Sequence, residues 1–384
     1  MLPILLLTTA RRINYAMKLT LQLKLLPTTD QKAILLATMK QFNAAATYAA
    51  RIGFEAKVYG QVGLHKLTYY NIRKQFGLSS HLTVRAIAKA VECFKRDKTK
   101  CHVFKSRSAT IYNYNMLSFK SLTTLSVLTL SGRTLIPFIC GDYWKPKQGR
   151  IKGEMDLIYR DRNFYLLCVI DEPEETPITP VDILGVDLGI VNIATDSTGE
   201  IFTGCKVEQI RQQYSKRRAG LNRTGTKSAR RRLSKARKRE SNFRKNENHR
   251  ISKCLVAKAK ATNSAIALED LKGIQNRVTV KKQQRARHNS WSFAQLRTFI
   301  EYKALLSGVP LILIDPRNTS RTCSSCGHCE KSNRKSQSEF VCCKCNYSMN
   351  ADCNAALNIR TKALVKVPIV GIDEAKAELS LSCG

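Results

Sequence analysis

The chain has 384 residues and a formal net charge of +36 at pH 7. Hydrophobic residues make up 43% of the sequence, which is enough for ordinary globular cores and excludes wholesale disorder. Because so basic a chain repels itself unless a polyanion neutralises it, we expect nucleic acid as its partner. A ribosomal-type structural protein and a basic surface without a function are the alternatives.

The first residues, 1–16, predict neither a membrane anchor nor a secretory signal. No apolar run in the chain reaches the roughly 18 residues that span a membrane, so no membrane partner is expected. The short run Leu2–Leu7 has Arg11 and Arg12 after it and no basic residue before it, which is the wrong polarity for a signal peptide. We expect a disordered extension or a start codon assigned too early, with Met17 as the alternative start.

A strand and two helices are predicted next. Residues 17–25 alternate leucine with polar residues, as in a half-buried strand. Pro27 ends the strand, and apolar residues at helical spacing predict a helix that begins near 28–30 and closes at Gly53. A second helix is predicted over about 83–98.

Residues 101–175 change to short β-rich runs between turns, typical of a small barrel or sheet. The strand at 17–25 belongs with them if the helices are inserted between. We therefore predict a β-rich domain of 17–27 and 101–175, and an inserted helical domain of 28–100. Asp171–Pro180, with four acids and three prolines, is interpreted as the linker to a domain of 176–384.

Three acids in the C-terminal half stand where strands end or a helix starts. Asp187 lies on an apolar strand that a hairpin follows, which is how ribonuclease H-like domains begin. Glu269 ends a second strand, 264–268, and Asp352 opens a helix. With a strand at 310–314 and a helix at 289–306, the order of elements predicts an α/β domain with a mixed sheet.

Phosphodiester hydrolysis explains such a set of acids. Two Mg²⁺ ions roughly 4 Å apart can activate a water and stabilise the leaving oxygen. Carboxylates are the ligands such ions prefer. We assign Asp187 as the bridging ligand, with Glu269 and Asp352 each completing one magnesium site. For each acid, a surface or capping role is the alternative.

The sequence contains 14 cysteines, of which seven fall between Cys323 and Cys353. Clustered cysteines in a large basic chain indicate a reducing, cytoplasmic location and a bound metal rather than a disulfide framework. Two Cys-x-x-Cys pairs separated by 15 residues match a structural four-cysteine zinc site within 318–348. The predicted ligands are Cys323, Cys326, Cys342 and Cys345. Cys329, Cys343 and His328 are alternative ligands.

Residues 206–250 hold 17 lysines and arginines against three glutamates. A helical hairpin with a basic face is predicted, and a disordered basic tract is the alternative. Because this stretch lies between the first two acids, it is expected beside the active site, where it contacts nucleic-acid phosphates. The residues of its dense centre are Arg230, Arg231, Arg232, Lys235, Arg237, Lys238 and Arg239.

Several short motifs resemble the TnpB (OrfB-type) proteins of insertion sequences, RNA-guided nucleases related to type V CRISPR effectors. They run in family order across the C-terminal half: GVDLGI (185–190), ALEDL (267–271), the segment 291–304 ending in EYKA, DPRNTSRTCSSCG (315–327), FVCCKC (340–345) and NADCNAALNI (350–359). Asn346 and Asn350-Ala351 depart from residues common in the family, but neither departure falls on a predicted ligand.

The resemblance implies a multidomain fold. An N-terminal β-barrel-like wedge domain would carry an inserted helical recognition domain, and a ribonuclease H-like RuvC domain with an inserted zinc ribbon would follow. It further implies DNA endonuclease activity, with Asp187, Glu269 and Asp352 as the acids, structural Zn²⁺ and catalytic Mg²⁺. The implied partners are a guide RNA from the same element and a double-stranded DNA target. A nuclease-inactive RNA-guided binder, a transposase that performs strand transfer and a structural zinc-ribbon RNA-binding protein remain alternatives.

Overall fold

The computed structural model describes residues 17–271 and 293–367, which form two compact units that divide between Pro173 and Glu174. The predicted N-terminal extension, Trp291 and Cys383 lie outside the described residues. Among those that are described, no helix is both long enough and apolar enough to cross a membrane.

A seven-stranded antiparallel sheet forms one half of the N-terminal unit, with the strand order β2-β6-β7-β1-β5-β4-β3. The first strand, as predicted, pairs with strands from far along the chain. The other six strands lie within the predicted β-rich region, 101–175, and β2 and β3 are only three residues long. The strands are β1 (Met17–Leu25), β2 (Thr110–Tyr112), β3 (Leu117–Phe119), β4 (Thr124–Thr129), β5 (Gly132–Ile139), β6 (Ile151–Arg160) and β7 (Asn163–Glu172).

The sheet curls until it is nearly closed. The Tyr112 hydroxyl on the edge strand β2 donates to the carbonyl of Leu128 on β4, near the opposite edge, at 3.1 Å. The side chains of Leu21, Leu23 and Leu25 alternate into the interior of the curl and are buried. The outer residues of β1 are mainly polar, so the alternating pattern seen in the sequence determines which face of the strand is inside.

Three helices pack on this sheet: α1 (Thr29–Glu55), α2 (Gln61–Phe76) and α3 (Ser80–Arg96). Thr28 and Gln31 form a reciprocal capping box at the start of α1. The helices and the sheet share one hydrophobic core, which includes Phe42, Ile87 and Phe138. The three helices and the sheet therefore belong to one compact unit.

The C-terminal unit contains a five-stranded mixed sheet with the order β10-β9-β8-β11-β12. β8, β11 and β12 run parallel, and β9 and β10 are antiparallel to their neighbours. The predicted succession of strand, hairpin, helix, strand, helix, strand and helix is observed. The strands are β8 (Asp182–Asp187), β9 (Asn192–Asp196), β10 (Ile201–Thr203), β11 (Ser264–Glu269) and β12 (Leu311–Ile314).

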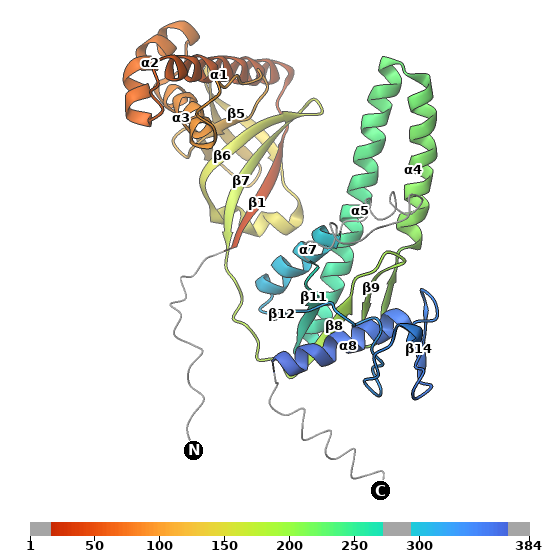
Figure 1. Ribbon diagram of the computed structural model, residues 1–384. Helices are drawn as coiled ribbons and strands as arrows, with labels where there is room; N and C mark the ends of the chain where they lie inside the picture. The colour runs from red at the N-terminus through yellow and green to blue at the C-terminus, as the bar shows by residue number, and fades with distance from the viewer. Residues whose placement is uncertain (1–16, 272–292, 368–384) are drawn as a thin grey trace, which may run out of the picture. The chain divides into compact units, whose positions relative to one another are not determined.

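Helices cover both faces of this sheet (Figure 1). α5 (Lys227–Ala261) and α7 (Phe293–Leu306) pack on one face, where Leu255 and Ile300 share a core with β8 and β11. α8 (Ala351–Lys366) packs on the other face. Leu296, Ile300 and Ala304 form the buried stripe of α7, whereas Leu305 is exposed.

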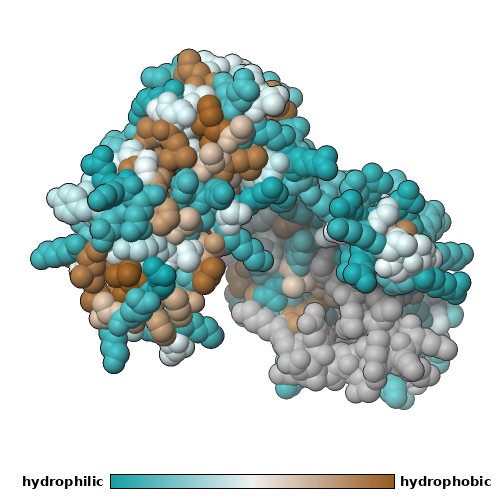
Figure 2. Space-filling model, turned by 90° about the horizontal axis from the view of Figure 1, so that it is seen from above, coloured by the Kyte–Doolittle hydropathy of each residue, from teal (hydrophilic) through white to brown (hydrophobic). Residues whose placement is uncertain are grey.

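α4 (Cys205–Thr224) and α5 form the predicted helical hairpin, which projects beyond the sheet (Figure 1). Gly225 makes the turn in the left-handed conformation at φ 62°, and Thr226 caps α5. Arg218 on α4 and Glu240 on α5 pair across the hairpin. The hairpin end is mostly hydrophilic in Figure 2, whereas the N-terminal unit exposes apolar residues, among them Val62 and Tyr70.

The ribbon occupies the residues between β12 and α8. Two short antiparallel strands, β13 (Glu339–Val341) and β14 (Ser348–Asn350), support it. Its core is small and contains Cys323, Phe340 and Cys342 together with Ala351 of α8. So little apolar burial cannot hold a fold without a further crosslink, which is the usual reason for a structural metal.

Candidate active site and cysteine cluster

Asp187 and Glu269 lie at the carboxyl ends of neighbouring parallel strands. Val186 of β8 is paired with Leu268 of β11, so the next residue on each strand is one of the two acids. Parallel strands bring their carboxyl ends to one edge of the sheet, which places both carboxylates there. The last residue of each strand thus supplies an acid to the same site.

Asp352 reaches this edge from the first turn of α8. The Asn350 side chain caps the helix by accepting from the backbone N–H groups of Asp352 and Cys353. The helix then crosses β8 at Gly185, where an added Cβ would overlap the Ala356 carbonyl oxygen. Glycine at this position therefore allows the close approach that brings Asp352 to the sheet.

Asp187 lies within the electrostatic influence of the other two acids. Burial, together with the nearby charges of Glu269 and Asp352, raises the pKa of Asp187 to about 7. Burial also raises the pKa of Glu269, while a hydrogen bond from Thr319 opposes that increase. A carboxylate whose pKa is raised by neighbouring negative charges lies close to them, and its ionisation is disfavoured by their repulsion. A bound cation would offset that repulsion.

Three polar residues that the sequence did not single out contact these acids. Asn192, on β9, donates from Nδ2 to Oδ2 of Asp352 at 2.8 Å. Arg334, from the ribbon, lies 3.5 Å from Oδ1 of Asp352 and lowers the pKa of Asp187. Thr319 Oγ1 lies 2.5 Å from Oε1 of Glu269. Their positions in the sequence gave no signal, because each contact depends on tertiary folding.

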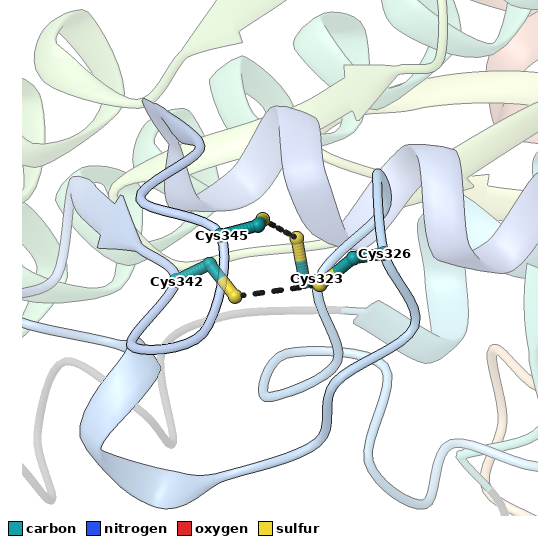
Figure 3. A group of neighbouring side chains, drawn as sticks. All are labelled: Cys323, Cys326, Cys342 and Cys345. Carbon is teal, nitrogen blue, oxygen red and sulfur yellow. Dashed lines mark hydrogen bonds between the residues drawn. The ribbon is translucent and has the colours of Figure 1, made fainter.

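The predicted cysteine ligands converge. The Sγ atoms of Cys323, Cys326, Cys342 and Cys345 all lie within 4.8 Å of one another (Figure 3). The Cys323–Cys345 and Cys326–Cys342 sulfur separations are 3.7 and 3.6 Å, far longer than a disulfide bond. Four sulfurs at about 2.3 Å from one Zn²⁺ would be about 3.8 Å apart in a tetrahedron.

The alternative ligands lie outside this group. His328 contacts Glu330, and Cys343 lies 3.2 Å from the Ser332 hydroxyl. In the described part of the chain, the four cysteines are the one group of three or more potential ligands found close enough for a single ion. Asp187, Glu269 and Asp352 do not form such a group.

The predicted basic residues are all exposed on the first half of α5. Ala229, Ala236 and Glu240 form the buried side of the same segment. Small residues face α4 while long cationic side chains point into solvent, so the hairpin presents charge on a rigid support. The structure places Arg230, Arg231, Arg232, Lys235, Arg237, Lys238 and Arg239 on this surface.

Two family models match the chain. Residues 166–275 match a family described as "Probable transposase", and residues 293–359 match "Cas12f1-like, TNB domain". The first match covers β7, the hairpin and the strands that end in Asp187 and Glu269. The second covers α7, the cysteine cluster and Asp352.

Three proteins illustrate the likeness in sequence. A CRISPR-associated endodeoxyribonuclease Cas12f1 of Sulfoacidibacillus thermotolerans is 30% identical over 65% of this chain and 61% of its own length. A TnpB-like protein of Methanocaldococcus jannaschii is 38% identical over 30% of this chain and 41% of its own. The putative RNA-guided DNA endonuclease InsQ of Escherichia coli is 26% identical over 51% of this chain and 53% of its own.

These matches cover 41–61% of the lengths of those proteins.

Among solved structures, a Cas12f1–sgRNA–target DNA complex aligns with a TM-score of 0.59 at 15% identity, over 87% of this chain and 83% of that one. The mini-RNA-guided endonuclease CRISPR-Cas_phi3 aligns with a TM-score of 0.54 at 10% identity, over 94% of each chain. At such low identity these two alignments show a shared fold.

Proposed function

This chain is a relative of the TnpB-like and Cas12f proteins, as its motifs predicted, and we propose on that premise that it is an RNA-guided DNA endonuclease. The observation that carries the proposal is the convergence of Asp187, Glu269 and Asp352 at one edge of the C-terminal sheet. Its guide would be an RNA from the same element, and its substrate double-stranded DNA.

The acid site fits divalent cations. Its carboxylates come from β8, β11 and α8, and burial together with the charges of Glu269 and Asp352 raises the pKa of Asp187 to about 7. Asp187, Glu269 and Asp352 would hold two Mg²⁺ ions, with Asp187 as the central ligand. When bound, such ions activate a water and stabilise the leaving oxygen of the phosphodiester.

Two neighbours of Asp352 have separate roles in this proposal. Asn192 holds one carboxylate oxygen by its amide and so orients the acid. Arg334 lies 3.5 Å from the other oxygen, where its guanidinium would contact the scissile phosphate. A guanidinium matches phosphate geometry and stabilises the charge that grows on its oxygens during transfer.

The cysteine cluster would hold structural zinc. The sulfur separations agree with a tetrahedral Zn²⁺ site, and all four positions are filled by protein side chains. Asn333 bonds the His328 carbonyl and the N–H of Cys343, and the next residue is Arg334. The folded ribbon would therefore place Arg334 at the acid site.

The remaining parts would hold nucleic acid. The exposed arginines and lysines of α5 would contact the backbone of the guide–target duplex. We assign the N-terminal sheet as the wedge domain and α1–α3 as the recognition domain, which would bind guide RNA and the motif beside the target. Base pairing would then supply the choice of sequence.

The test is plasmid cleavage by the protein co-expressed with its flanking genomic locus. Wild type and Asp187→Ala would be compared in Mg²⁺ and in EDTA, at sites that match the co-purified RNA. We expect cutting by the wild type in Mg²⁺ alone, and none by Asp187→Ala. Tight RNA binding without cutting would instead indicate an RNA-guided binding protein, and joined DNA products would indicate strand transfer.

A further inference from the structure

One stripe of α8 holds the chain segment that connects β12 to the ribbon. Four residues spaced by one turn bond backbone carbonyls of that segment and of the end of β12, in reverse order. Asn354 Nδ2 donates to Thr322 O at 2.8 Å, and Asn358 Nδ2 donates to Thr319 O at 2.8 Å and to Thr322 O at 2.6 Å. Lys362 reaches the Asp315 and Arg317 carbonyls, and Lys366 Nζ donates to Leu313 O at 2.8 Å.

Positions four apart lie on one face of a helix, so the side chains of this stripe follow the segment along its length. Asn354 is fully buried, and its Oδ1 also accepts from the N–H of Ser324 at 3.0 Å. Asn358 is 6% exposed. Loop carbonyls without regular partners are thus satisfied by a helix that also carries Asp352.

Thr319 lies in the middle of the held segment and is 3% exposed. Its Oγ1 is 2.5 Å from Oε1 of Glu269 and 3.0 Å from the Pro316 carbonyl. A hydroxyl can donate only one hydrogen bond at a time. Because a carboxylate is a stronger acceptor than a backbone carbonyl, the Thr319 hydroxyl donates to Glu269. The backbone carbonyl of the same residue is fixed by Asn358.

We propose that Thr319 is a positioning residue that fixes the Glu269 carboxylate, and that the Asn358 amide of α8 holds Thr319 in place. The inference rests on the proposed function, since it assigns Glu269 to the cation site. The segment that connects β12 to the ribbon would then also position a ligand of the cation site. Helix α8 would then position two of the acids: Asp352, which it carries, and Glu269, through Asn358 and Thr319.

The test compares Thr319→Val, which keeps the shape and removes the donor, with Thr319→Ser, which keeps the donor. Thr361→Val is the matched control, because the Thr361 hydroxyl bonds within α8 and is exposed. Mn²⁺ affinity would be measured by electron paramagnetic resonance on the RNA-loaded protein. The Mg²⁺ concentration for half-maximal cleavage would be measured beside it, with zinc content and melting temperature as checks on folding.

We expect Thr319→Val to weaken Mn²⁺ binding and to raise the Mg²⁺ requirement by about tenfold, the usual effect of losing a residue that orients a metal ligand. Thr319→Ser should restore both values, and Thr361→Val should match wild type. In a double-mutant cycle, Thr319→Val should add no further loss to Glu269→Gln, whereas general unfolding would add.

Unchanged Mn²⁺ affinity in Thr319→Val, or no recovery in Thr319→Ser, would overturn the inference. So would a loss of Mn²⁺ affinity that adds fully to the loss in Glu269→Gln. A wild type that binds Mn²⁺ but cuts no DNA would contradict the proposed function alone, because Mn²⁺ affinity would still decide the role of Thr319. A wild type that binds no Mn²⁺ would overturn both.

Discussion

The cysteine cluster and the acid site are built in opposite ways. The four cysteines come from two loops, and residues only 16 and 22 positions apart meet within a ribbon that has almost no other core. The three acids come from β8, β11 and α8, and they meet only when the whole C-terminal sheet is assembled. One site organises its own surroundings, whereas the other is organised by the surrounding fold.

The difference determines what damage to each site should do. If the four cysteines hold zinc as proposed, loss of one cysteine would remove a crosslink on which the small ribbon depends, and the local fold would be lost with the ligand. Loss of Glu269 or Asp352 would remove a negative charge that raises the pKa of Asp187, from a sheet whose core does not depend on it. The acid site should therefore lose chemistry without losing structure, and the ribbon should lose structure first.

Asp352→Asn should have the largest effect on cleavage. The substitution keeps the shape and removes a magnesium ligand, so cutting should fall below detection. Zinc should stay at one ion per chain. The melting temperature should not fall, because a repelling charge has left a buried site. Inductively coupled plasma spectrometry, thermal melting and a cleavage assay measure the three quantities. A drop in zinc content would contradict the independence of the two sites.

Cys323→Ser should have the next largest effect on cleavage, because it disturbs the fold of the ribbon. Zinc should fall below one ion per chain, and cleavage should drop by about 10² to 10³, the loss expected when a charge-stabilising donor such as Arg334 is displaced. Cys329→Ser is the matched control, since Cys329 is exposed and outside the cluster. Full zinc content in Cys323→Ser would exclude it as a ligand.

Gly185→Ala should disturb the acid site from within the fold. A Cβ there overlaps backbone atoms of Ala356 and Arg360 on α8, so helix and strand must separate. We expect a loss of about 1–3 kcal/mol in the free energy of unfolding, with weaker cleavage and unchanged zinc. Gly220→Ala is the control, because a Cβ in the middle of α4 meets nothing within 4 Å. Equal denaturant midpoints for wild type and Gly185→Ala would refute the argument.

Much of the fold could be predicted because its elements carry strong local patterns. β1 alternates without interruption, and α1 begins at a threonine with a capping glutamine three residues later. The prediction missed α2 because only Leu64, Thr68 and Ile72 face the core, and exposed Val62 and Tyr70 blur the stripe. Strands β2 and β3 have three residues each, too few to show a period.

The candidate site divides in the same way. The cysteine pairs could be found by spacing, because both members of each pair lie on one tight turn. Each acid could be found by its place at the end of a strand or the start of a helix. Arg334 and Thr319 could not be predicted from the sequence, because they reach Asp352 and Glu269 through ribbon contacts alone. Whether these residues act in cleavage stays a prediction for the experiments above.

The α4–α5 hairpin differs from both the acid site and the cysteine cluster. Its contribution to nucleic-acid affinity should be spread over many residues, so that no single residue has a large effect. Arg231, Lys235 and Arg239 are exposed and lie four apart on one face of α5. Changing all three to glutamine should weaken binding of the guide–target duplex. It should also reduce the slope of log affinity against log salt by about two to three, because each lost phosphate contact removes roughly 0.7 to 0.9.

The control changes the exposed serines Ser228, Ser234 and Ser241 of the same helix to alanine, which leaves the charge intact. Binding titrations at several salt concentrations measure the slope for each triple variant. A single arginine change should alter the slope by less than one unit. In contrast, a single change at the acid site or the cysteine cluster should strongly reduce cleavage. If the glutamine variant kept the wild-type slope, this face of α5 would not contact phosphates, and the charge of the hairpin would need another explanation.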